Sequence, residues 1–160
     1  MSVINQFIHT STIATVTADV GVATGVGHNV NIIGGTNIST SAAGSTLTIN
    51  AGPFWTEVTA ASLSIVANNA YMMNRGTLIT ATLPVLAAKG TMIKFTGMGA
   101  GGYKIAQNNG QIIYFGTLAT TPGIGGSMSS TFDRDSIELV CVVENTDFNV
   151  LSSIGNFLVV

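Results

Sequence analysis

The chain has 160 residues, of which 46% are hydrophobic and 8% are charged, and its formal net charge is −2. That length suits one ordinary domain, or one domain with an additional arm. Five Lys and Arg residues in total are too few for the many phosphate contacts of a nucleic-acid-binding protein, so that class is excluded.

Two kinds of targeting segment are not expected. The first residues lack a basic stretch and a long apolar core, so they do not predict a signal peptide, and we expect synthesis in a cytoplasm. Polar residues interrupt every apolar run before it reaches about 18 residues, so membrane insertion is not expected either.

Charge is distributed very unevenly along the chain. The only acidic or basic residue among the first 56 is Asp19. Soluble monomers normally carry about a quarter charged residues, which keep copies of the protein apart. A surface this neutral predicts contact with other protein surfaces, and therefore a subunit of an assembly rather than a free enzyme.

Residues 1–52 are expected to form an extended β arm of short strands separated by Gly-rich turns. They contain too little apolar surface for a core of their own, and ordering a backbone costs about 1–2 kcal/mol per residue. We therefore predict that this arm contacts neighbouring copies in an intertwined homotrimer. The apolar residues expected to make those contacts are Val16, Val30, Ile32, Ile33, Leu47 and Ile49.

Residues 53–160 are expected to form an all-β domain, an antiparallel sandwich or barrel. They hold the single Trp, all three Tyr and all five basic residues, and their clear apolar period is 2. Turn signals at Gly, Asn and Lys separate many short strands, as in sandwiches and barrels. The predicted strands are 56–66, 69–73, 77–83, 91–96, 103–107, 111–115, 127–132, 136–144, 147–152 and 156–160.

Two connections have specific expectations. Asn108–Gly110 lies between two apolar strands, and its Asn-Gly pair predicts a β-hairpin with a type I′ turn. Leu83–Lys89 is the only place where the sequence suggests a single helical turn.

The strand at 136–144 is the clearest of all. Ile137, Leu139, Cys141 and Val143 form a wholly apolar set, and the opposite set is apolar in its middle and charged at its ends. This pattern is typical of a central strand buried on both faces. We therefore assign these four residues to the domain core, and interpret Cys141 as a packing residue rather than a nucleophile.

No catalytic, cofactor or metal site is predicted. Gly97–Gly102 matches the glycine spacing of dinucleotide-binding loops, but a strand rather than a helix is expected to follow, which favours a flexible β-turn. His9 and His28 could bind a metal only if a three-fold axis united three copies. Asp133–Asp135 could bind calcium, but Arg134 between the carboxylates favours a salt-bridged or solvated start of the next strand.

Exposed aromatic residues are the candidates for contact with a partner. Trp55, Tyr103 and Tyr114 are the residues assigned to this role, the partner being a host-surface receptor or glycan. A soluble carbohydrate-binding module would use the same residues or Tyr71.

Several segments resemble β-rich domains of tail-fibre and other appendage proteins of tailed bacteriophages. The similarity rests on Ala81–Pro84 followed by Lys89–Phe95, on Gly101–Gly116, and on Asp135–Cys141 continuing to Phe148–Asn156. Val30–Thr40 is similar to the N-terminal shaft segments of such proteins. The chain is shorter than long fibres and lacks their repeat arrays. The resemblance implies a homotrimeric, non-enzymatic virion component.

The expected function is therefore that of a bacteriophage virion structural protein, extracellular as part of the particle. It would be a short trimeric fibre, spike or appendage subunit attached through the arm to other virion proteins of the capsid or tail. A capsid decoration protein and a subunit of a non-viral extracellular filament remain alternatives.

Overall fold

The computed structural model describes residues 15–17, 22–24, 32–33, 38–43, 46–51 and 55–160. Val30, His9 and His28 lie outside these residues, and the side chain of Val16 is not described. The chain divides into two compact units, of which the second contains the continuous stretch 55–160. Each unit is described by itself.

The N-terminal unit contains two small sheets of two strands each. β1 (Thr15–Thr17) pairs antiparallel with β2 (Val22–Thr24), and β3 (Ile38–Ala43) pairs with β4 (Thr46–Ala51). The large apolar side chains described here, those of Ile32, Ile33, Ile38, Leu47 and Ile49, are all exposed within the single chain. A two-stranded ladder has no second layer against which they could pack.

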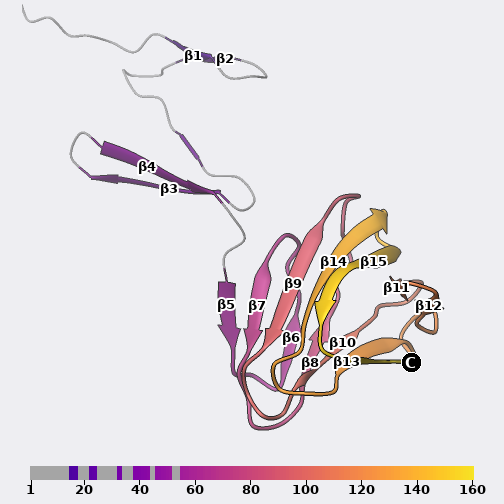
Figure 1. Cartoon of the computed structure of the whole chain (residues 1–160). Helices are drawn as coiled ribbons and strands as arrows, with labels where there is room; N and C mark the ends of the chain where they lie inside the picture. Colours follow the sequence, from indigo (N-terminus) through magenta and orange to yellow (C-terminus); the bar gives the residue numbers. More distant parts are fainter. Residues whose placement is uncertain (1–14, 18–21, 25–31, 34–37, 44–45, 52–54) are drawn as a thin grey trace, which may run out of the picture. The chain divides into compact units, whose positions relative to one another are not determined.

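The C-terminal unit is an all-β sandwich of two sheets, which confirms the predicted class (Figure 1). No helix occurs in the residues that the structure describes. In spatial order the larger sheet consists of β12 (Leu118–Ala119), β11 (Ile112–Phe115), β15 (Asp147–Ile154), β14 (Ser136–Val143), β9 (Met92–Gly97), β7 (Ala70–Met73) and β5 (Trp55–Val58). The smaller sheet consists of β16 (Phe157–Val159), β13 (Ser127–Ser130), β10 (Tyr103–Ala106), β8 (Ile79–Thr82) and β6 (Ser62–Ser64).

The first half of the sandwich is wound as a coil. From β5 to β10 each strand belongs to the sheet opposite that of the strand before it, so β5, β7 and β9 lie side by side in parallel, as do β6, β8 and β10. The expectation of uniformly antiparallel pairing is wrong for this half. A chain that crosses to the other layer and back returns in its original direction, and the apolar period of 2 is the same for both kinds of pairing.

The second half is mainly antiparallel. β14 pairs antiparallel with β9 and with β15, while β13 pairs antiparallel with β10 and β16. β14 is therefore the middle strand of seven, as its sequence suggested. Its outward residues are only partly buried, however, because the second sheet covers one face alone.

Large side chains of both sheets form the core between the layers. Phe95 stacks between Tyr71 and Tyr103, with ring centroids 5.8 Å from each. Fully burying one large apolar side chain stabilises a fold by about 1.5–3 kcal/mol. Tyr71, Phe95, Tyr103 and Phe148 therefore supply core material, as expected for the region after position 53.

Three of the four residues assigned to the core on β14 are buried there. Ile137, Leu139 and Cys141 are at most 3% exposed, whereas Val143 is 50% exposed. The pairing of β14 with β15 shifts between Cys141 and Val143, which interrupts the alternation of faces. The core assignment of Val143 is therefore wrong, and the irregularity that exposes it depends on the partner strand.

Both specific expectations for connections are also wrong. Asn108–Gly110 is a turn with Gly110 at φ +77°, but it joins β10 in the smaller sheet to β11 in the larger one. Asn108 Nδ2 donates to the Leu83 carbonyl at 2.6 Å, and Gln111 Nε2 donates to the Pro84 carbonyl at 2.8 Å. These bonds hold the start of Leu83–Lys89 in a non-helical conformation, and proline already disfavours helix at Leu83.

Candidate ligand-binding groove

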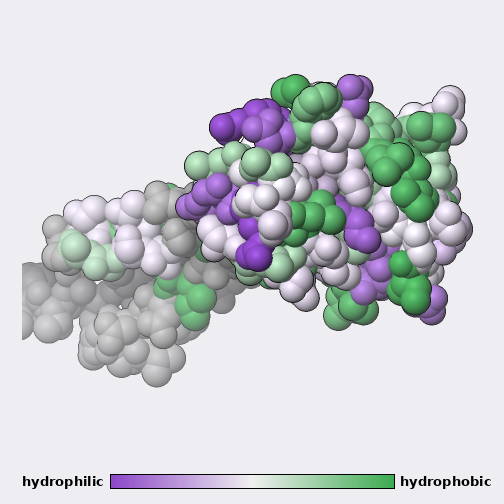
Figure 2. Space-filling view, turned by 90° about the horizontal axis from the view of Figure 1, so that it is seen from below, coloured by the Kyte–Doolittle hydropathy of each residue, from purple (hydrophilic) through white to green (hydrophobic). Residues whose placement is uncertain are grey.

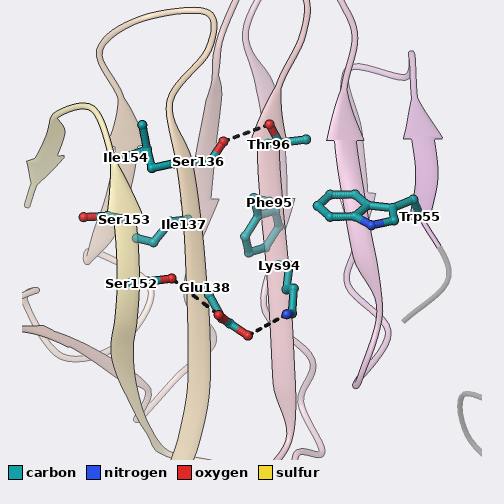
Figure 3. A pocket seen from close by; sticks show the side chains of 10 residues that line it. All are labelled: Trp55, Lys94, Phe95, Thr96, Ser136, Ile137, Glu138, Ser152, Ser153 and Ile154. Atoms are coloured by element: carbon teal, nitrogen blue, oxygen red, sulfur yellow. Dashed lines mark hydrogen bonds and ion pairs between the residues drawn. The ribbon is translucent and has the colours of Figure 1, made fainter. Parts of the chain in front are cut away.

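A groove of about 350 Å³ lies on the outer face of the seven-stranded sheet (Figure 3). Its lining comes from β5, β9, β14 and β15, which are far apart in sequence. The lining residues are Trp55, Lys94, Phe95, Thr96, Ser136, Ile137, Glu138, Ser152, Ser153 and Ile154.

Strand alternation decides which of these side chains reach solvent. Phe95 and Ile137 are buried in the core, so they contribute to the floor of the groove from its inner side. Their neighbours Lys94, Thr96 and Glu138 point outward because successive residues of a strand face opposite sides. The middle of the groove is therefore polar, while the exposed apolar side chains of Trp55 and Ile154, at 48% and 73%, lie on either side of it.

Strand register places five residues in one row across the sheet. Trp55 pairs with Ala70, Ala70 with Lys94, Lys94 with Glu138, and Glu138 with Ser152. A row of directly paired residues shares one face. Ser152 is thus the direct neighbour of the polar pair on one side, and Trp55 lies beyond Ala70 on the other side.

The small side chain of Ala70 explains how Trp55 joins the row. The indole extends from β5 over β7 toward β9 (Figure 3). Ala70 is its register partner on β7, is fully buried and does not belong to the core cluster. Trp55 itself is 48% exposed. One side of the ring is therefore covered by the sheet, and the other side is open to solvent.

Charges in the groove are paired with each other. Lys94 Nζ lies 2.9 Å from Glu138 Oε1, and the Ser152 hydroxyl donates to Glu138 Oε2 at 3.4 Å. The Thr96 and Ser136 hydroxyl oxygens are 2.8 Å apart. Both charged side chains keep partial exposure, at 35% and 21%, so the groove presents donors and acceptors without a net charge.

This ion pair is the only one in the part of the chain that the structure describes. Partly exposed pairs contribute little to stability, typically about 0–1 kcal/mol. A chain with so few charges has nevertheless placed two of them side by side in the groove. The arrangement offers noncovalent binding through one aromatic face, one cation, one carboxylate and several hydroxyls.

The three aromatic residues predicted as exposed contacts have different positions. Trp55 lies in the groove, and Tyr114 is partly exposed on β11, outside it. Tyr103 is fully buried, and its hydroxyl donates to the Asp135 carbonyl at 3.1 Å, so its assignment as an exposed contact is wrong. Burial, and to a lesser extent the Asp135 charge, raises the pKa of Tyr103 well above its ordinary value.

The sequence prediction missed the polar residues of the groove. Lys94 was seen only as part of a strand, and Glu138 only as a charged strand end. A charge inside an apolar strand was the signal available, because such a residue must face solvent or a partner. Its partner could not be read from the sequence, since cross-strand register is not a local property.

The other polar candidates serve local structure. Asp135 is buried, and its carboxylate accepts hydrogen bonds from the backbone N–H groups of Thr131 and Phe132 at 2.8 and 2.9 Å. Asp133 and Arg134 before it are exposed, so this start of β14 is solvated at two residues and held by backbone amides at the third, with no salt bridge among the described residues. Gly97–Gly102 leads into β10 and not into a helix, so it lacks the context of a dinucleotide site.

The described residues lack two further features. They contain no group of three or more His, Cys, Asp or Glu side chains placed to hold a metal ion. Nor do they contain a helix whose length and apolarity would let it cross a membrane.

The chain was compared with known protein families and with curated proteins. Neither comparison finds a match.

Proposed function

We propose that this chain is a non-enzymatic structural subunit of a bacteriophage virion, a short trimeric fibre, spike or appendage subunit. In this proposal residues 1–52 attach the subunit to other virion proteins and to its own copies. The sandwich is then the part presented outward, on an extracellular particle.

One observation carries the proposal. The large apolar side chains described in the N-terminal unit are exposed within the single chain, with Ile33 at 84% and Ile49 at 57%, and strands β1 to β4 carry no charged residue. Exposed apolar surface of this kind marks contact sites with other proteins. Closed symmetric homo-oligomers are the commonest way to cover it.

The groove favours an appendage over a capsid decoration subunit. A cementing subunit needs contact surfaces toward the shell, whereas an appendage also needs a surface for an external ligand. The outer face of the seven-stranded sheet supplies such a surface at Trp55, Lys94 and Glu138. The resemblance to tail-fibre domains points in the same direction.

Light scattering on the purified chain tests the assembly. We expect a mass three times that of the 16.4 kDa chain at micromolar concentration. Deleting residues 1–52 should leave a folded β domain by circular dichroism and should abolish assembly. A full-length monomer, or normal assembly of the truncated chain, would contradict the proposal.

Immunogold labelling of particles from the source then distinguishes the locations. Label at the tail or at projecting structures supports the appendage. Label spread over the head identifies a decoration subunit, and label on filaments that contain no virion identifies a non-viral filament.

A further inference from the structure

We propose that the groove beside Trp55 binds an uncharged oligosaccharide. The inference deepens the proposed function and rests on it in one respect, namely that the sandwich is the part presented to an external ligand.

The open face of Trp55 is the first element of the site. Because the indole extends over β7 and Trp55 is 48% exposed, the side of the ring that faces away from the sheet forms a flat, rigid apolar platform (Figure 3). The face of an aromatic ring is its negative region. The C–H groups on one side of a pyranose ring are weakly positive and apolar, so they match that platform.

The Lys94–Glu138 pair is the second element. An ammonium group only donates hydrogen bonds and a carboxylate only accepts them. Two neighbouring sugar hydroxyls, each of which can donate and accept, match such a pair held 2.9 Å apart. The hydroxyls of Thr96, Ser136 and Ser152 add further groups of the same kind along the groove.

The balance of charge argues against an acidic sugar or another anion. Lys94 is the only cation in the groove, and Glu138 already neutralises it. A carboxylated or sulfated ligand would have to compete with Glu138 for Lys94. An uncharged ligand can use both members without separating them.

The floor of the groove argues against an extended peptide. Peptides that bind as strands need an unpaired sheet edge. Here the floor is formed by β9 and β14, and both strands are paired on both sides. β9 lies between β7 and β14, and β14 lies between β9 and β15. Recognition must therefore use side chains, as it does for a sugar.

A second copy of this chain also fits the groove poorly. Charged residues are depleted in the cores of protein interfaces, whereas this surface has an ion pair at its centre. The exposed apolar side chains of the sandwich occur in separate patches on the face shown in Figure 2, interrupted by hydrophilic residues.

The groove is longer than one sugar ring. From β5 to β15 there are four strand spacings, or about 19 Å. Trp55 and Ser152 lie toward opposite ends of this span. The site therefore suits an oligosaccharide of several units better than a monosaccharide.

The chain provides its own reporter for the test, because Trp55 is its only tryptophan. The full-length assembled protein is applied to a printed array of neutral, sialylated and sulfated oligosaccharides. Each hit is then titrated while tryptophan emission is recorded. We expect saturable binding of neutral members with a change in emission, and binding at least ten-fold weaker for charged counterparts.

Matched variants assign the binding to the groove. Trp55→Ala removes the fluorescent reporter, so its binding is measured on the array, where it should be at least ten-fold weaker. The pair of substitutions Lys94→Gln with Glu138→Gln should weaken binding several-fold in the titration. Phe132→Ala removes an exposed aromatic side chain outside the groove, so it should leave binding unchanged. Circular dichroism and oligomer mass are measured for every variant.

Several results would overturn the inference. These are no array binding, tighter binding of charged members, or equal binding by Trp55→Ala. Protection of Trp55 from acrylamide quenching in the assembled protein, but not in dissociated chains, would show that a second copy covers the groove. A trimer that binds no saccharide would contradict this inference and leave the proposed function intact. A monomer that binds saccharide would contradict the proposed trimeric subunit and support the groove as a binding site.

Discussion

Strands β4 and β14 carry similar alternating patterns but bury them very differently. On β4, Leu47 and Ile49 are 43% and 57% exposed, whereas Ile137 and Leu139 on β14 are almost fully buried. β14 is the middle strand of a seven-stranded sheet with a second sheet beneath it, and β4 has one neighbouring strand. The comparison teaches that an apolar stripe defines which face must be covered, while the number of layers in the same chain decides whether it is covered.

The largest expected difference between the regions is in the stability of a single chain. Phe148 is fully buried on β15, so Phe148→Ala should lower the free energy of unfolding by about 3–5 kcal/mol. Ile49→Ala removes an exposed side chain, so it should change that quantity by less than about 0.5 kcal/mol. Urea unfolding followed by circular dichroism measures both.

The oligomer mass should respond in the opposite way. Ile49→Ala should weaken assembly, whereas Phe148→Ala should leave assembly intact in molecules that remain folded. Equal losses of stability in the two variants would mean that β4 already packs against a core within one chain.

A second test asks whether the tight packing of the sandwich extends into its turns. A Cβ atom at Gly101 would lie 2.1 Å from the Thr77 backbone, so Gly101→Ala should destabilise by about 1–3 kcal/mol. Gly76 is the matched control, because its Cβ would meet no atom within 4 Å. We expect Gly76→Ala to stay within about 0.5 kcal/mol of the wild type in thermal unfolding. A neutral Gly101→Ala would show that this turn is loosely held.

High pH should destabilise the sandwich through its buried tyrosines. Burial raises the pKa of both Tyr71 and Tyr103 in the folded chain. Above about pH 10 the unfolded chain ionises these tyrosines while the folded chain keeps them protonated. Below about pH 10 the two tyrosines therefore do not change the free energy of unfolding. Above it, that free energy falls as the pH rises, by at most about 1.4 kcal/mol per pH unit for each tyrosine. Unfolding curves at pH 8 and pH 11 check this, and equal midpoints would contradict it.

The smallest effect is expected at Cys141. Its Sγ lies 3.1 Å from the Val143 carbonyl and 3.3 Å from that of Ala87, so a serine hydroxyl would find acceptors there, though at stretched distances. Cys141→Ser should therefore cost about 1 kcal/mol. Burial also raises the pKa of the thiol, so native protein should react with a thiol reagent far more slowly than denatured protein. Rapid labelling of the native protein would place this strand segment in contact with solvent.

The local pattern was sufficient to predict the strands and one face of the core. Alternating apolar residues located β7 to β11 and β13 to β16 within a few positions, and they placed Ile137, Leu139 and Cys141 inside. These features depend on the period-2 geometry of a single strand, which is the same wherever that strand pairs. The predicted strand 56–66 is the exception, because the chain bends within it and the two pieces join different sheets.

The tertiary structure alone decided which strands became neighbours and therefore which surface could act as a site. The coiled winding, the exposure of Val143 and the burial of Tyr103 all depend on partner strands that no local pattern specifies. The same holds for the groove, because Trp55, Lys94, Glu138 and Ser152 meet only through the register of five strands. A strand's own sequence determines which side chains share a face, whereas the residues that lie beside them are set by long-range pairing and by the packing of the two layers.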